Sequence, residues 1–399
     1  MAALCVTLGG NTLFSFQVLS MNAFDHLAWA LLWWLAVRAL RGGSRSWLGF
    51  GLVAGLGLQN KISVLFPGFG LLLGLLLLRR DVLARREIWM AALLAGLLFF
   101  PHVVWQIAHG FPTREFVAHA QAEKMVAFTP LEFLARAALE AGPQTLPVWL
   151  AGLVGLFTLR RWSAQRALAV AFVAVLALLA VTRSKPYYAA PAFSLTLAAG
   201  GVALEAVQRL GWLVRGAATT LALVGGILVT PLAKPVLSEH AFERYAARLG
   251  ITPQSGERHE LWRLPQHFAD MHGWRELAQA VARVYASLGA PERALAFVFG
   301  QNYGEAGAID FFGPELGLPP ALSGHNNYFL WGPRDWTGEV LIVIGDERER
   351  LLELFEDVEL AGRTSCRDCM PYEDGLALWI CRRLRQPVST LWPTLKHYI

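Results

Sequence analysis

The chain has 399 residues, of which 55% are apolar and only 16% are charged, and its mean hydropathy is +0.41. Soluble globular proteins carry about 25% charged residues, so this composition argues against an ordinary cytosolic protein. Residues 1–237 have 19 Lys and Arg against 8 Asp and Glu, whereas residues 238–399 have 16 against 22. The excess base lies in the apolar part, which excludes nucleic-acid binding as the reason for the pI of 9.2.

Membrane-spanning helices need about 20 mostly apolar residues each. One apolar stretch, Trp47–Leu78, is too long for a single span and is interrupted by Gln59, Asn60 and Lys61, which predicts two short helices with a polar turn between them. We expect about nine spans in total: this pair and Ala3–Leu19, Ala23–Leu40, Ile88–Ile107, Leu146–Leu159, Ala167–Val181, Tyr187–Val207 and Leu213–Leu232. Glycine pairs such as Gly51/Gly55 and Gly70/Gly74 predict faces where these helices approach closely.

Arginine residues set the expected orientation, because loops rich in Lys and Arg stay in the cytoplasm. Twelve arginines share one side of the predicted arrangement: Arg38, Arg41, Arg45, Arg79, Arg80, Arg85, Arg86, Arg160, Arg161, Arg166, Arg209 and Arg215. Residues 1–237 are therefore predicted to form a multi-span α-helical membrane domain. Residues 238–399 follow the last crossing and are predicted to form a soluble domain outside the cytoplasm.

The tail, residues 238–399, has the pattern of an α/β domain. Trp274–Leu288 has helical periodicity, and the short β-rich runs Ala294–Phe299 and Val340–Ile344 end at glycines and precede helical segments. The Gly-rich stretch Gly300–Gly307 lacks the spacing of a nucleotide-binding loop, so we interpret it as a strand-to-helix turn that borders an acceptor site.

Cysteines in the tail favour a disulfide over a metal site. A zinc site at Cys366 and Cys369 would need a second pair of ligands nearby, and the sequence has none there, so no metal site is predicted. Outside the cytoplasm a disulfide is the better interpretation, with Cys369–Cys381 and Cys366–Cys369 as the two alternatives.

Polar residues at membrane depth are costly and are the first candidates for function. Asn22 and Asp25 stand at the outer end of the second span, where a carboxylate can act as a base or orient a head group; alternatively, the pair belongs to a helix N-cap and first turn. Lys61 lies in the broken span, where it can bind a phosphate as a point charge or simply extend toward the interface.

Two further outer segments carry charge. Arg183, Lys185 and Tyr188 surround a helix that is predicted to begin at Pro186, which makes a phosphate pocket plausible, although interfacial belts share this composition. The loop His109–Gly142 is predicted to form amphipathic helices on the membrane surface. No spacing singles out one of its carboxylates, so we interpret them as a solvated face.

Several of these segments together resemble the bacterial branch of glycosyltransferase family 39. This family comprises protein O-mannosyltransferases and aminoarabinose transferases and has the GT-C membrane fold. The segments that carry the resemblance are Ser20–Asp25, Gly55–Lys61, Arg183–Tyr188 with Pro191, Asn302–Ala306, and Ser323–Tyr328 with Trp331–Pro333.

The resemblance implies a multi-pass protein of the bacterial inner membrane with a periplasmic C-terminal domain. It would move a sugar from a polyprenyl-phosphate donor to a protein, lipid or glycan acceptor on the outer face, with no cofactor. Lys61, Arg183 and Lys185 would hold the lipid phosphate beside Tyr188, and their charge would stabilise the leaving group as the glycosidic bond breaks. Asn22 would lie near the donor.

One family feature has no counterpart in the sequence. Relatives carry an acidic motif in the first outer loop, and its Asp is the expected general base. The present sequence begins at what corresponds to the third or fourth span of a relative, so we expect it to be incomplete at its N-terminus, with Asp25 as a weak substitute base. Two other functions therefore stay open: a transporter or flippase, and a non-catalytic membrane relative.

Overall fold

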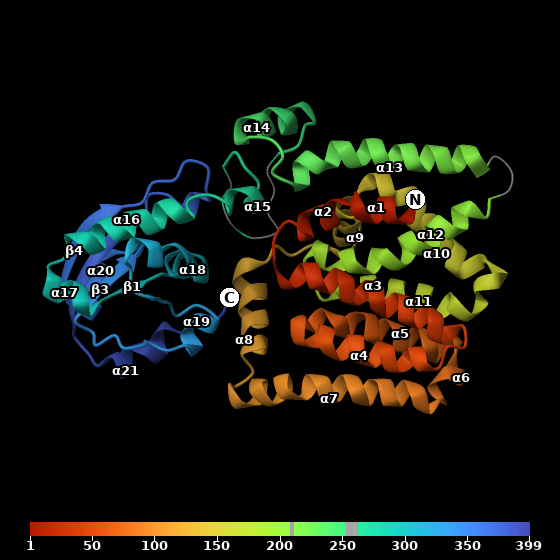
Figure 1. Ribbon diagram of the computed structural model, residues 1–399, viewed down its shortest axis with the longest axis horizontal. Helices are drawn as coiled ribbons and strands as arrows, with labels where there is room; N and C mark the ends of the chain where they lie inside the picture. The colour runs from red at the N-terminus through yellow and green to blue at the C-terminus, as the bar shows by residue number, and fades with distance from the viewer. Residues whose placement is uncertain (208–210, 253–257, 259, 261) are drawn as a thin grey trace. The chain divides into compact units, whose positions relative to one another are not determined.

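The computed structural model describes residues 1–207, 211–252, 258, 260 and 262–399 (Figure 1). The chain folds into two compact units. The helical unit contains Met1–Gly110 and Ala127–Ser238, and the α/β unit contains Phe111–Val126 and Glu239–Ile399. The α/β unit thus includes Phe111–Val126, a stretch that lies within residues 1–237, the predicted membrane domain.

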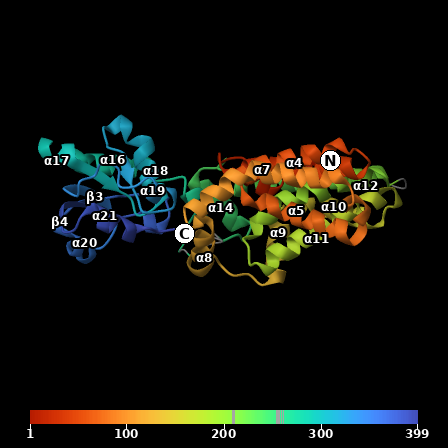
Figure 2. The same cartoon turned by 90° about the horizontal axis from the view of Figure 1, so that it is seen from below.

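The helical unit is built from apolar helices, as Figures 1 and 2 show, and short 3-10 segments precede four of the described helices, α5, α10, α11 and α12. Its elements are α1 (Ala2–Thr7), α2 (Gly10–Ser15), α3 (Met21–Leu40), α4 (Arg45–Asn60), η1 (Ile62–Val64), α5 (Leu65–Leu78), α6 (Arg80–Leu83), α7 (Arg86–Ala108), α9 (Pro130–Glu140), η3 (Pro143–Thr145), α10 (Leu146–Thr158), η4 (Arg160–Gln165), α11 (Arg166–Val181), η5 (Pro186–Ala192), α12 (Phe193–Glu205) and α13 (Gly211–Ala233).

Four helical stretches among the described residues are long and apolar enough to cross a membrane: Arg86–Ala108, Arg160–Val181, Pro186–Glu205 and Gly211–Ala233. Ile62–Leu78 is a shorter apolar helix. The unit is therefore a helical membrane unit, and the expected total of about nine spans stays a prediction.

The predicted break in the long apolar stretch is confirmed. Helix α4 ends at Asn60, Lys61 is extended with φ −156° and ψ 132°, and η1 leads into α5. The polar side chains at the break donate hydrogen bonds to neighbouring helices: Asn60 Nδ2 lies 2.9 Å from the carbonyl oxygen of Met21, and Gln59 Nε2 lies 2.6 Å from that of Leu98. These bonds satisfy polar groups that would otherwise be costly at membrane depth.

The prediction of a single helix over Ala3–Leu19 is wrong. The segment contains two six-residue helices, α1 and α2, which are separated at Leu8 and Gly9. The backbone passes close to another segment at this point, because a Cβ atom built on Gly9 would lie 3.0 Å from the carbonyl oxygen of Ala141. Glycine permits this approach and weakens a continuous helix.

Close packing at the predicted glycine faces is confirmed. A Cβ atom on Gly55 would lie 2.6 Å from Cβ of Leu98 in α7, and one on Gly70 would lie 2.6 Å from the carbonyl oxygen of Ala171 in α11. Because glycine has no side chain, α4 packs closely against α7 at Gly55, and α5 packs closely against α11 at Gly70.

The α/β unit contains α8 (Pro112–His119), η2 (Ala120–Lys124), α14 (Glu239–Arg248), α15 (Gln266–Ala269), α16 (Trp274–Ser287), α17 (Ala290–Leu295), β1 (Ala296–Phe299), α18 (Tyr303–Phe312), η6 (Pro314–Leu316), β2 (Ala321–Leu322), α19 (Asn327–Leu330), β3 (Val340–Ile344), α20 (Arg348–Leu354), β4 (Phe355–Arg363), η7 (Pro371–Glu373), β5 (Ala377–Leu384), α21 (Val388–Leu391) and η8 (Trp392–Leu395). The predicted helix from Trp274 and the strands ending before Gly300 and Gly345 are confirmed.

The strands form one five-stranded sheet with the order β2-β1-β3-β5-β4. Strand β1 is parallel to β2 and β3, whereas β5 is antiparallel to β3 and β4. Side chains alternate between two buried clusters: Ile342 of β3 packs with α16 and α18, and its neighbour Val343 packs with α20 and α21. Helices therefore cover both faces of the sheet.

Of the two disulfide alternatives, the structure contains Cys366–Cys369. Cys381 is a free cysteine, fully buried in β5 among the residues packed against α20 and α21. Its position in the sheet core keeps it out of the loop that holds the other two cysteines, so the alternative Cys369–Cys381 is wrong.

Candidate functional site

A buried ion pair lies at the break between α4 and α5. Lys61 Nζ is 3.3 Å from Asp25 Oδ2, with side-chain exposures of 12% for Lys61 and 2% for Asp25. Lys61 is at this place because α4 ends one residue before it, and Asp25 is there because the first turns of α3 pack against η1. Each charge offsets part of the desolvation cost that the other would carry alone in an apolar environment.

Asn22 and Tyr188 complete the surroundings of the ammonium. Lys61 Nζ donates a hydrogen bond to Asn22 Oδ1 at 2.7 Å and lies 4.9 Å from the ring centre of Tyr188. An ammonium has three N–H donors. Within the described parts of the chain, two oxygen atoms lie within reach of these donors, in Asn22 and Asp25, and the Tyr188 ring lies next to the ammonium.

Two side chains that the sequence analysis did not single out fix the carboxylate of Asp25. Trp29 Nε1 donates to Oδ1 at 3.0 Å, and Ser63 Oγ donates to the same oxygen at 2.6 Å. The spacing of Asp25 and Trp29, four residues apart in a helix, was a usable signal. No sequence pattern points to Ser63, because its contact depends on how α3 and η1 pack.

The helix cap at this end of α3 is Ser20, whose Oγ accepts a hydrogen bond from the backbone N–H of Asn22 at 3.3 Å. The alternative in which Asn22 and Asp25 serve as cap and first-turn acid is therefore wrong. Both side chains point to Lys61 instead of to the end of the helix.

The other two predicted cations, Arg183 and Lys185, lie shortly before Tyr188 in the sequence. As predicted, a helix begins at Pro186: Lys185 is the N-cap of η5, and η5 packs against α3. Lys185 is half-buried, whereas Arg183 is exposed and has a left-handed backbone with φ 53°. The structure thus brings Asn22, Asp25, Lys61 and Tyr188 into one cluster. The Arg183 side chain, in contrast, is exposed.

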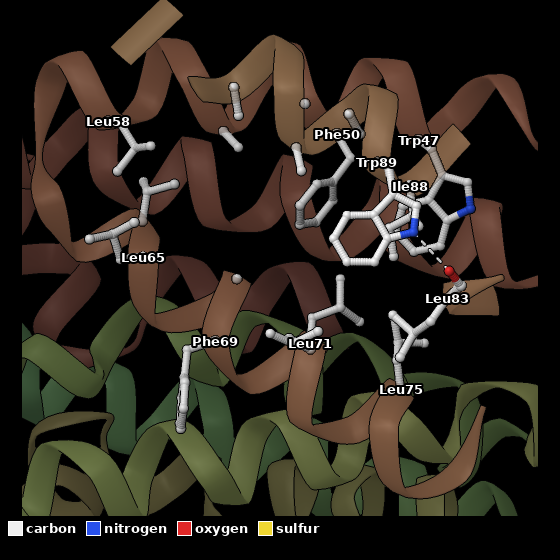
Figure 3. Close-up of a pocket in the computed structure, with 18 residues that line it drawn as sticks. Trp47, Phe50, Leu58, Leu65, Phe69, Leu71, Leu75, Leu83, Ile88 and Trp89 are labelled. Carbon is white, nitrogen blue, oxygen red and sulfur yellow. Dashed lines mark hydrogen bonds between the residues drawn. The ribbon is translucent and has the colours of Figure 1, made fainter. Parts of the chain in front are cut away.

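An apolar cavity of about 500 Å³ begins next to the broken helix. Leu58, Val64 and Leu65, which flank Lys61 in sequence, line one end of it, and Figure 3 shows Trp47 and Trp89 at the other end. Its wall comes from α4, α5, α6 and α7 and consists almost entirely of hydrocarbon and aromatic side chains. The arrangement can accept a long apolar chain whose polar end lies near Lys61.

Two carboxylates of the segment His109–Gly142 have structural partners. Glu132 and Thr129 form a reciprocal cap at the start of α9, and Glu115 of α8 pairs with Lys396 at 2.6 Å. Glu132 therefore acts as a helix cap and Glu115 as the partner of a cation, and the interpretation of the segment as a solvated face stays a prediction.

The turn after β1 is the predicted strand-to-helix turn. The Asn302 side chain caps α18 by accepting from the backbone N–H groups of Gly304 and Glu305, and its amide donates to Glu305 and Glu373. Burial, reinforced by the nearby Glu373, raises the pKa of Glu305 to about 8, and burial raises the pKa of Glu373 to about 7.

No group of acidic, His or Cys side chains suited to a metal ion occurs among the described residues.

Fold and site together describe a helical membrane protein with an ion pair at a helix break beside an apolar cavity. A family model described as dolichyl-phosphate-mannose-protein mannosyltransferase matches residues 1–105, roughly a quarter of the chain. This segment contains Asn22, Asp25, Lys61 and every residue that lines the cavity, and it is similar to membrane glycosyltransferases. No curated protein and no solved structure matches the chain.

Proposed function

We propose that the protein is a membrane glycosyltransferase that takes a sugar from a polyprenyl-phosphate donor and passes it to an acceptor on the outer face of a bacterial inner membrane. In this proposal Lys61 binds the donor phosphate, the cavity between α4, α5 and α7 holds the prenyl chain, and the α/β unit lies in the periplasm. The observation that carries the proposal is that Leu58 and Val64, three residues before and three residues after Lys61, both line that cavity.

Charge explains the role of Lys61. As the bond between sugar and phosphate breaks, negative charge grows on the phosphate oxygen that leaves, and a fixed ammonium stabilises this charge more than it stabilises the donor. The contacts with Asn22 and Asp25 fix the ammonium before the donor arrives. Arg183 and Lys185 would supply further positive charge from the exposed side, with Tyr188 beside them.

The contacts of Asp25 favour a positioning role over that of a general base. Oδ1 already accepts hydrogen bonds from Trp29 and Ser63, and Oδ2 pairs with Lys61. The side chain is only 2% exposed. A carboxylate so placed orients Lys61, and the proton of the acceptor would go to a different group.

A transfer assay tests the proposal. Membranes that contain the full chain are incubated with polyprenyl phosphate carrying radiolabelled mannose, and label that leaves the lipid fraction is counted. We expect release above that of membranes without the protein, and a loss of at least tenfold in Lys61→Met. A hydrogen bond to a charged group contributes about 1.5–3 kcal/mol, which corresponds to roughly a 10- to 150-fold effect.

Lys234→Met is the matched control, because Lys234 follows the last helix of the same unit and is remote in sequence from the site. It should keep the parental rate. Equal release by the parent and Lys61→Met would contradict the phosphate site. Movement of the intact labelled lipid across the membrane without release would instead support the flippase alternative.

A further inference from the structure

The α/β unit contains a second cavity, of about 410 Å³, on the sheet face that α20, α21 and η8 cover. Its floor is apolar and includes Leu341 and Val343 of β3, with Leu351 of α20 above them. Its polar lining consists of Gln301, Asp346, Arg350, Thr394, Lys396 and His397. The volume lies within the range of about 300–1,000 Å³ that is typical of small-molecule sites.

The position of this cavity follows from the sheet topology. After β1 the chain turns into α18, which packs on one face of the sheet, and after β3 it turns into α20, which packs on the other face. Strands β1 and β3 are parallel neighbours, so their carboxyl ends lie together while the segments that follow them diverge. In sheets of this kind ligands bind in the crevice at such a point of divergence. Gln301 follows β1, and Asp346 follows β3.

Three planar polar side chains of the cavity lining lie close to one another. Gln301 Nε2 lies 3.4 Å from Asp346 Oδ2, and Arg350 Nη1 lies 3.7 Å from Asp346 Oδ1. The Asp346 side chain is 11% exposed and is held by the backbone N–H of Glu347 at 2.8 Å, whereas Arg350 is 64% exposed. A carboxylate, an amide and a guanidinium therefore meet above an apolar floor.

This chemistry disfavours a phosphate ligand. The backbone N–H groups of Gly304 and Glu305 at the start of α18 do not line the cavity, and they already donate to the Asn302 side chain. The N–H of Gln301 donates to Glu305 at 2.6 Å. The carboxylate of Asp346 in the cavity lining would also repel an anion, and Lys396 of the same lining already pairs with Glu115. Hydroxyl groups, in contrast, can donate to Asp346 and accept from Gln301 and Arg350.

We propose that this crevice is a saccharide-binding site, in which Asp346, Gln301 and Arg350 hold the hydroxyl groups of one or two sugar rings against the apolar floor. The site is separate from the transfer chemistry proposed for the helical unit. It gives the α/β unit a function of its own, the capture of a neutral glycan.

Saturation-transfer NMR on the full chain in lipid nanodiscs tests this inference, since nanodiscs avoid detergents with sugar head groups. The probes are neutral mono- and disaccharides of mannose, glucose, galactose and N-acetylglucosamine, with inorganic phosphate and uridine diphosphate as rivals. We expect at least one saccharide to bind, and its affinity to fall at least tenfold in Asp346→Asn and in Arg350→Ala. Asparagine tolerates the left-handed backbone at this position, where φ is 73°, so Asp346→Asn keeps the fold.

Two matched variants serve as controls. Asp335→Asn changes an exposed aspartate that does not line the cavity, and Arg348→Ala changes an exposed arginine of the same helix as Arg350. Both should bind the saccharide like the parent. Saccharide binding by the parent without any release of sugar from the lipid donor would uphold this inference and contradict the proposed transfer. Binding of no saccharide, equal binding by Asp346→Asn and the parent, or displacement of the saccharide by phosphate would overturn this inference.

Discussion

Loss of one partner of the Asp25–Lys61 pair should destabilise the helical unit far more than loss of both. In Lys61→Met the carboxylate of Asp25, with 2% exposure, keeps its neutral donors Trp29 and Ser63 but loses its cation. Removal of one partner of a buried pair costs about 3–5 kcal/mol, because an uncompensated charge stays buried. The double variant Asp25→Asn/Lys61→Met has no such charge, so we expect it to recover at least about 2 kcal/mol.

A double-mutant cycle in detergent micelles measures this effect. The free energy of unfolding is obtained for the parent, Asp25→Asn, Lys61→Met and the double variant from reversible denaturant titrations. The reasoning predicts that the double variant is more stable than Lys61→Met, with a coupling energy well above the roughly 0.5 kcal/mol error of additivity. Strictly additive losses would show that the two charges do not depend on each other, and the account of the site would be wrong.

Three further outcomes follow from the structure. Gly68→Leu should weaken binding of polyprenyl phosphate, measured by titration calorimetry, because a side chain there enters the apolar cavity without meeting other atoms; Gly96→Leu, also in open space but outside the cavity, should not. Cys366→Ser removes the closure of a four-residue loop and should lower the denaturation free energy of the α/β unit by about 2 kcal/mol, while reductant should leave the variant unchanged. The free energy of unfolding of this unit should fall as pH rises from about 4.5 to 8, since Glu305, with a pKa of about 8, holds in the folded state a proton that the unfolded chain releases. Glu305→Gln should flatten that pH profile, and an unchanged slope would refute the assignment.

Local sequence signals predicted the parts of the fold that depend on a few consecutive residues. Three polar residues inside an apolar stretch predicted the helix break at Lys61, and β-branched runs ending at glycine predicted β1 and β3. The sequence analysis did not anticipate β4, an edge strand in which Glu and Asp are frequent and only Phe355 and Val358 are buried. Nor did apolar composition alone anticipate that Gly9 would divide the first helix.

The site was predicted in part. Polar residues at membrane depth pointed to Asn22, Asp25 and Lys61 because each is costly there without a partner. Their mutual contacts, and the role of Ser63, depend on how α3 packs against η1, and no spacing in the sequence encodes that packing. The cavity between α4, α5 and α7 was also invisible in the sequence, because apolar residues that line a cavity and those that face lipid have the same composition.

Photolabelling with a polyprenyl phosphate that carries a diazirine in its prenyl chain tests the central claim most directly. After irradiation of membranes that contain the full chain, labelled peptides are identified by mass spectrometry. The account predicts label on the cavity walls of α4, α5 and α7, competed by unlabelled polyprenyl phosphate, and strongly reduced in Lys61→Met but not in Lys234→Met. Label spread evenly over the lipid-facing helices, with no effect of Lys61→Met, would contradict the claim that Lys61 and the cavity form a binding site for the lipid-linked donor.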